Sequence, residues 1–152
     1  MRPAVVLILA ALLAGCGGGG GGAAAARKDY VKALNRAQSG LTQRFGALQQ
    51  RVTPTSTPEQ DQRTLDAYGR VVDDTVRDLR AVRPPAGFEA LHRRFIAQVA
   101  SYGTALQEAR RRLRSDRPQT VLEAQSVLRG AVQRTGEQLN ATIKAINDRL
   151  KD

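Results

Sequence analysis

One thiol in the chain stands where covalent chemistry is feasible. Cys16 is the only cysteine of the 152 residues, so the chain offers it no disulfide partner. It directly follows the small residues Ala14 and Gly15, which are typical of the sites where exported proteins are cleaved. A thiol next to such a site is suited to alkylation by a lipid, and Cys16 is therefore our first candidate.

The residues before Cys16 have the organisation of an export signal. Met1-Arg2 gives a short positive start, and the apolar run from Ala4 to Leu12 is far too short to cross a bilayer as a helix. With Leu13-Ala14-Gly15-Cys16, this organisation resembles the lipobox signal of bacterial lipoproteins. The resemblance implies cleavage between Gly15 and Cys16, diacylglycerol on the Cys16 sulfur, and a mature protein anchored at the extracytoplasmic face of the cell membrane.

Two other interpretations of this segment fit less well. An ordinary secretory signal prefers small residues at the last and third-last positions, and a cut after Ala14 would place Leu12 in the second of them. A cytosolic chain would leave residues 4–14 as an isolated hydrophobic segment followed by six glycines. We expect export, and with it no nucleic-acid partner, although the formal net charge is +10.

The single histidine, His92, is the main candidate for metal or cofactor chemistry. With Glu89 it forms Glu-x-x-His, a motif that carboxylate-bridged di-iron bundles use twice, and the chain has no second histidine. Haem attachment would need Cys-x-x-Cys-His, and the only methionine is Met1. We expect no metal and no cofactor, and a hydrogen bond from His92 to backbone at the end of the core. The alternative is a bundle that holds a lipid, metal or haem-like group near His92.

No constellation in the sequence predicts an enzyme. His92 is the only side chain that titrates near neutral pH, and no nucleophile lies near it in sequence. Residues 17–22 precede neither a strand nor a Lys-Ser/Thr pair, so they do not predict a phosphate-binding loop. One acidic group remains, and because basic neighbours such as Arg77 surround it, it predicts an ion-paired surface. Its members are Asp73, Asp74 and Asp78.

Four segments carry apolar residues at alternating steps of three and four, the spacing of amphipathic helices. They cover about residues 27–51, 58–82, 87–114 and 118–150. Thr57-Pro58-Glu59-Gln60 predicts a capping box for the second helix, Pro84-Pro85 ends it, and Asp116 predicts an N-cap for the fourth. We expect an all-α, up-down-up-down antiparallel four-helix bundle over residues 27–152, behind a signal peptide (1–15) and a flexible tether (16–26).

This topology gathers the cations at the two ends of the bundle. At the end nearest the membrane, where anionic lipid headgroups are close, it places Arg27, Lys28, Lys32, Arg80, Arg83, Arg93, Arg94, Lys144, Arg149 and Lys151. At the far end it places Arg110, Arg111, Arg112, Arg114 and Arg117. Five guanidinium groups in eight residues suit bidentate contacts with phosphate or carboxylate. We hypothesise that the far end binds an anionic envelope polymer or an acidic protein; the alternative for both groups is a solvated surface.

The combination of a lipobox, a glycine tether and a Pro84-Pro85 step with His92 shortly after it is similar to small uncharacterised helical lipoproteins of high-GC Gram-positive bacteria. The resemblance implies a helical domain that faces the cell envelope, and it implies no activity. We therefore expect a non-enzymatic, membrane-anchored binding or interaction module.

Overall fold

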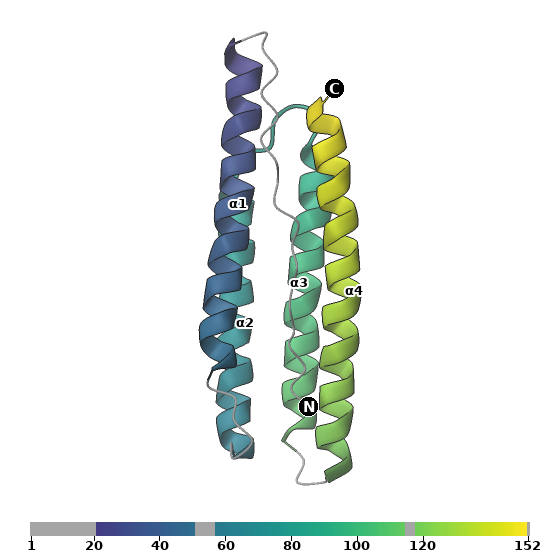
Figure 1. Cartoon of the computed structure of the whole chain (residues 1–152). Coiled ribbons are helices and arrows are strands. Elements are labelled where there is room, and N and C mark those ends of the chain that lie inside the picture. The colour runs from purple at the N-terminus through teal and green to yellow at the C-terminus, as the bar shows by residue number, and fades with distance from the viewer. Residues whose placement is uncertain (1–20, 51–56, 115–117, 152) are drawn as a thin grey trace.

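The chain forms a bundle of long helices. The computed structural model describes residues 21–50, 57–114 and 118–151, which contain α1 (Gly21–Gln49), α2 (Pro58–Ala81), α3 (Glu89–Arg112) and α4 (Pro118–Lys151). Successive helices run antiparallel, with α1 against α2, α2 against α3 and α3 most extensively against α4 (Figure 1). The predicted up-down-up-down four-helix bundle is confirmed. The signal peptide, the Gly15–Cys16 cleavage site, Asp116 and Arg117 lie outside the described residues.

Most helix boundaries agree with the sequence pattern to within two residues. At the start of α2, Thr57 Oγ1 accepts a hydrogen bond from the Gln60 backbone N–H (3.3 Å), and Gln60 Oε1 accepts one from the Thr57 N–H (2.8 Å). This is the predicted capping box. The start of α1 differs, because α1 begins at Gly21 and residues 21–26, predicted as tether, are helical. The alanines of this segment have the highest helix propensity of all residues, so the helix extends back through them.

The core is one apolar cluster to which all four helices contribute. It consists of Tyr30, Val31, Leu34, Leu41, Phe45, Val72, Val76, Leu79, Phe88, Phe95, Val99, Leu106, Leu139, Ile143 and Ile146. Near the start of α4, the sequence pattern predicts Val121 and Gln125 on the buried face, and this prediction is wrong. Val121 and Gln125 are exposed there, while Ala124 and Ala131 are buried.

One glycine marks a close approach of two helices, and it is neither Gly130 nor Gly136, the two positions inside α4 where glycine in the sequence predicts a bend or a close helix contact. A Cβ atom at Gly136 would meet open space, and one at Gly130 would meet only the flexible Arg134 side chain. At Gly103 in α3, a Cβ would lie 3.2 Å from Val72 Cγ1 in α2. A side chain at position 103 would therefore require Val72 to shift by a few tenths of an ångström.

The bundle has two different ends. We call the end that holds the start of α1, the α2–α3 connection and the end of α4 the proximal end, and the opposite end the distal end. The first turns of α1 extend beyond the rest of the proximal end (Figure 1). Although α1 and α4 neighbour each other in this topology, their backbones make little close contact. Side chains that cross the bundle, such as Tyr30, therefore help to join α1 to the other helices.

Candidate functional site

His92 is buried beneath the proximal end and is hydrogen-bonded on both sides of its ring. Its side chain is 4% exposed. Nε2 lies 3.0 Å from the backbone oxygen of Leu79 in α2, and Nδ1 lies 3.2 Å from the hydroxyl of Tyr30 in α1. The predicted hydrogen bond from His92 to backbone is confirmed. The sequence analysis missed Tyr30, whose spacing of four from Leu34 continues the apolar stripe of α1 by one turn.

These partners define the protonation state of the ring. A backbone carbonyl only accepts hydrogen bonds, so Nε2 carries the proton and Nδ1 accepts from the Tyr30 hydroxyl. Burial lowers the pKa of His92 below its ordinary 6.5, although the backbone carbonyls of Leu79 and Val82 oppose this change. Burial also raises the pKa of Tyr30 well above 10, so its hydroxyl remains a donor. The pair is a neutral hydrogen-bonded link between α1, α2 and α3.

An aromatic cluster surrounds this link. The Tyr30 ring packs edge to face on Phe88, with centroids 5.8 Å apart, and on His92 at 5.5 Å. On the other side, Arg27 Cζ lies 6.0 Å from the centre of the Phe88 ring, within the range of a cation–π contact. The aromatic side chains close the proximal end of the core, and the cations lie outside them.

The Glu-x-x-His motif does not assemble a metal site. Glu89 is exposed, and its Oε2 accepts a hydrogen bond from the Gly87 N–H at 2.9 Å. Gly87 has a φ of +85°, which a residue with a side chain rarely adopts, so Glu89 stabilises the turn before α3. Both His92 nitrogens already have protein partners, and in the part of the chain that the structure describes no three His, Cys, Asp or Glu side chains are grouped as metal ligands. His92 has no nitrogen left for a ligand.

Two of the three grouped aspartates of α2 form ion pairs, as their basic neighbours predicted, whereas Asp73 is exposed and has no ion pair among the described residues. Asp74 lies 2.9 Å from Arg77 and 3.9 Å from Arg44 of α1, and Asp78 lies 3.4 Å from Arg77. All of these side chains are at least partly exposed. The group therefore supplies surface ion pairs between and within helices, which individually add little to stability.

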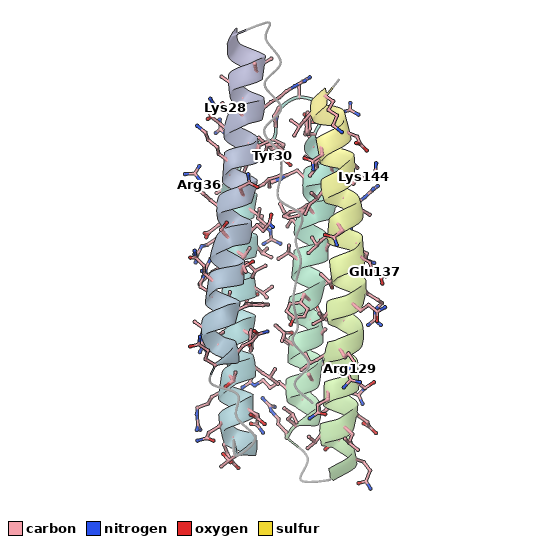
Figure 2. The ribbon with its side chains drawn as sticks, in the orientation of Figure 1. Lys28, Tyr30, Arg36, Arg129, Glu137 and Lys144 are labelled. Carbon is pink, nitrogen blue, oxygen red and sulfur yellow. The ribbon has the colours of Figure 1, made fainter. Side chains whose placement is uncertain are left out.

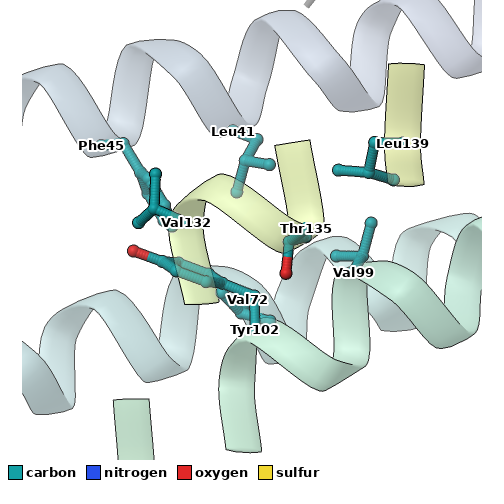
Figure 3. Close-up of a pocket in the computed structure, with 8 residues that line it drawn as sticks. All are labelled: Leu41, Phe45, Val72, Val99, Tyr102, Val132, Thr135 and Leu139. Carbon is teal, nitrogen blue, oxygen red and sulfur yellow. The ribbon is translucent and has the colours of Figure 1, made fainter. Parts of the chain in front are cut away.

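A small cavity lies in the centre of the bundle, away from His92 (Figure 3). Its volume is about 20 Å³, enough for roughly one water molecule and far below the few hundred Å³ of a typical ligand pocket. Its walls are Leu41, Phe45, Val72, Val99, Tyr102, Val132, Thr135 and Leu139. The cavity has no room for a lipid chain or haem without separation of the helices.

The arginines predicted to bind anions at the distal end face carboxylates of the protein itself. Arg110 Nε lies 2.7 Å from Asp66 Oδ1 in α2. Arg112 contacts Glu108 at 3.0 Å and Glu123 of α4 at 2.9 Å. Arg111 also donates to Glu108, and these hydrogen bonds hold the pKa of that carboxyl below its ordinary value.

Another contact also fixes this region: Gln62 of α2 donates to the backbone oxygen of Leu113 at 3.0 Å, just after α3. The predicted distal cluster is thus partly neutralised within the bundle. Of its members, Arg114 is exposed and Arg117 lies outside the described residues.

The proximal end is different, because most of its cations have no such partner. Asp29 lies 3.9 Å from Lys32, and Asp148 contacts Lys144 at 2.6 Å and Lys151 at 3.5 Å. The other proximal cations make no ion pair with a carboxylate of the described residues. They come from all four helices and the α2–α3 connection. Lys28 on α1, which is one of them, points away from the bundle, as does the paired Lys144 on α4 (Figure 2).

Comparisons with known proteins add no family or homologue. No protein-family model matches the chain, no curated protein matches it, and no solved structure matches it. Among the helices that the structure describes, none combines the length and the apolar character needed to cross a membrane.

Proposed function

We propose that this protein is a membrane-anchored, extracytoplasmic lipoprotein whose bundle is a non-enzymatic binding or interaction module. The observation that carries the proposal is Leu13-Ala14-Gly15-Cys16, placed after a short apolar segment and containing the only cysteine. A single acyl chain gives only reversible membrane binding. The diacylglycerol that the resemblance implies for Cys16 supplies two chains and would hold the bundle at the membrane.

Two features of the bundle support a non-enzymatic role. The one side chain suited to acid–base work near neutral pH, His92, is buried and has both nitrogens bonded to the protein. In the acidic cluster of α2, Asp74 and Asp78 are paired with Arg77. Long helices with exposed polar faces provide extended surfaces for contact with another molecule, and this is the role we assign to them.

The anchor is tested by the Cys16→Ser variant. Wild-type protein expressed in a bacterium with the lipoprotein pathway should incorporate labelled palmitate and partition into the detergent phase of a cloud-point extraction. Cys16→Ser should incorporate no label. Gly18→Ser is the matched control, because it adds the same hydroxyl two residues away and keeps the thiol. A Cys16→Ser protein that retains wild-type labelling would refute the lipoprotein assignment.

The interaction role is tested by crosslinking in native membranes. The lipidated protein should be captured in a defined crosslinked complex with an envelope component. A chain that is crosslinked to nothing above the level of a mock sample would argue against an interaction module.

A further inference from the structure

The cations of the proximal end come from all four helices and the α2–α3 connection rather than from one helix, and we call them together the ring of cations. Arg80 and Arg83 come from the end of α2 and the following connection, and Arg93 and Arg94 from the beginning of α3. All four side chains are exposed. Cations near the N-terminus of a helix gain nothing from the helix dipole, so helix stability does not explain Arg93 and Arg94.

Contacts within the bundle place several parts of the proximal end at a common level. Arg27 of α1 lies over Phe88, and the Arg149 guanidinium of α4 is close enough to Gly87 that a Cβ there would lie 3.0 Å from Nη2. The start of α1, the α2–α3 connection and the end of α4 therefore present their charges together. A flat anionic surface placed against this end would contact exposed cations from several helices together.

A short uncharged helix projects from this ring. Residues 21–26 of α1 are glycine and alanine, and the side chains described there are exposed. At 1.5 Å per residue this segment is about 9 Å long. The polar headgroup layer of one leaflet is roughly 5–8 Å thick. Residues 21–26 are therefore long enough to pass through the headgroup layer, and the ring of cations would then lie level with the lipid phosphates.

We propose that the proximal end is a docking surface for anionic lipid headgroups, and that it holds the bundle end-on against the membrane. The proposal rests on the proposed lipid anchor, which supplies the membrane on that side. Only residues 17–20 separate Cys16 from α1, and five residue steps span at most roughly 18 Å. The anchor therefore keeps the proximal end, and not the distal end, within reach of the headgroups.

The test uses the chain from residue 16 onward with Cys16→Ser, so that no lipid contributes to binding. It is sedimented with vesicles of phosphatidylcholine alone and of phosphatidylcholine with 30% phosphatidylglycerol, at low and physiological salt. We expect at least tenfold stronger binding to the anionic vesicles at low salt, and a steep decrease as salt screens the charges. Failure to bind the anionic vesicles at low salt would overturn the proposal.

Matched variants separate the docking surface from net charge. Arg80, Arg83, Arg93 and Arg94 are changed together to Gln. The control changes four exposed arginines outside the proximal end, namely Arg63, Arg70, Arg129 and Arg134, to Gln. Each charge near an anionic membrane contributes roughly a factor of five to partitioning. We expect the proximal variant to lose more than tenfold and the control less than twofold. Equal losses would show that only net charge matters and would overturn the proposal.

Orientation gives a second readout that does not depend on affinity. Cys16→Ser leaves a chain without cysteine, so a polarity-sensitive dye can be attached to Ala86→Cys in the α2–α3 connection or to Gln119→Cys at the distal end. On anionic vesicles the dye at residue 86 should be quenched by lipid-borne quenchers and the dye at residue 119 should not. The reverse pattern, or retention on a purified anionic wall polymer but not on vesicles, would contradict membrane docking.

Failure of the anchor and failure of the docking surface give different results. The vesicle experiment contains no lipid on the protein, so its result does not depend on whether Cys16 is modified in the cell. A protein that is lipidated but does not bind anionic vesicles would overturn the docking proposal alone.

Discussion

The two ends of the bundle carry clusters of cations that look alike in the sequence and differ in the structure. At the distal end, three consecutive arginines lie in the last turn of α3, where the helix dipole favours cations, and carboxylates from three helices pair with them. At the proximal end, two carboxylates pair with lysines, and the arginines have no carboxylate partner among the described residues. A run of basic residues thus indicates a free cationic surface only if the neighbouring helices do not neutralise it.

The ends also differ beneath their charges. Tyr30, Phe88 and His92 close the proximal core with rings and hydrogen bonds. Toward the distal half, the Phe45 ring packs edge to face on Tyr68 with centroids 4.8 Å apart, beside the small central cavity. Packed side chains of α1, the α2–α3 connection and α3 therefore lie beneath the cationic surface and join the segments that carry its charges.

The largest effect should follow from removing the aromatic base of the proximal end. Phe88 is 1% exposed, and Phe88→Ala should lower the free energy of unfolding by about 3–5 kcal/mol, because it removes buried ring surface and leaves a cavity. Leu122→Ala, at a distal position that is 68% exposed, is the control and should change it by less than about 0.5 kcal/mol. Urea unfolding followed by circular dichroism measures both. A loss below about 1 kcal/mol for Phe88→Ala would show that this ring does not close the core.

A smaller effect should follow from His92→Gln. The shorter amide cannot hold both Leu79 O and the Tyr30 hydroxyl as the ring does, and a buried group left without a partner costs roughly 1–3 kcal/mol. Tyr30→Phe removes the hydroxyl alone, and the double variant measures how far the two losses are shared. Strictly additive losses would show that the two side chains do not act as a pair.

The lowered pKa of His92 predicts that the stability of the bundle depends on pH. Because the pKa of His92 is held below 6.5 in the folded protein, the unfolded chain binds a proton that the folded chain does not as the pH falls. The stabilisation is complete above pH 6.5 and decreases as the pH falls toward the lowered pKa. Urea midpoints between pH 8 and pH 5 should show this decrease in wild type and a flatter curve in His92→Gln. Identical slopes in the two proteins would assign the decrease to other groups.

The smallest change in stability, less than about 1 kcal/mol, should follow from removing the carboxylates that neutralise the distal end. Asp66→Asn, Glu108→Gln and Glu123→Gln together would leave Arg110, Arg111 and Arg112 without their partners. The distal end should then resemble the proximal end and bind anionic vesicles or polyphosphate at higher salt than wild type. Removing carboxylates from the surface between the two ends, with Asp73→Asn, Asp74→Asn and Glu137→Gln, controls for net charge. If both triple variants gain equally, the distal pairs do not mask a site.

The fold could be predicted well because its signals are local. The apolar spacing of three and four follows from the helix itself, and the capping box at Thr57 lies within four consecutive residues. One error, at the start of α1, occurred where alanine propensity extends the helix, and the other occurred at the start of α4, where packing decides which side chains are buried. At the start of α4, Ala124 is buried and Val121 is exposed, and at Gly103 a Cβ atom would lie 3.2 Å from Val72 Cγ1 of α2. Neither outcome can be predicted from the residue's own segment, because burial and close contact depend on the helices packed against it.

The sequence by itself determined four amphipathic helices and their antiparallel order, and it is the sole basis of the export signal that we propose around Cys16. Only the tertiary structure decided which polar groups meet. Tyr30 and His92 are 62 residues apart, and His92 and Leu79 are separated by a turn and 13 residues. The distal arginines meet Asp66 and Glu123 on other helices, whereas the proximal arginines meet no carboxylate in the described part of the chain. Helical periodicity is a property of neighbouring residues, but neutralisation of a charge depends on the rotation and level of helices packed against each other, which no local pattern specifies.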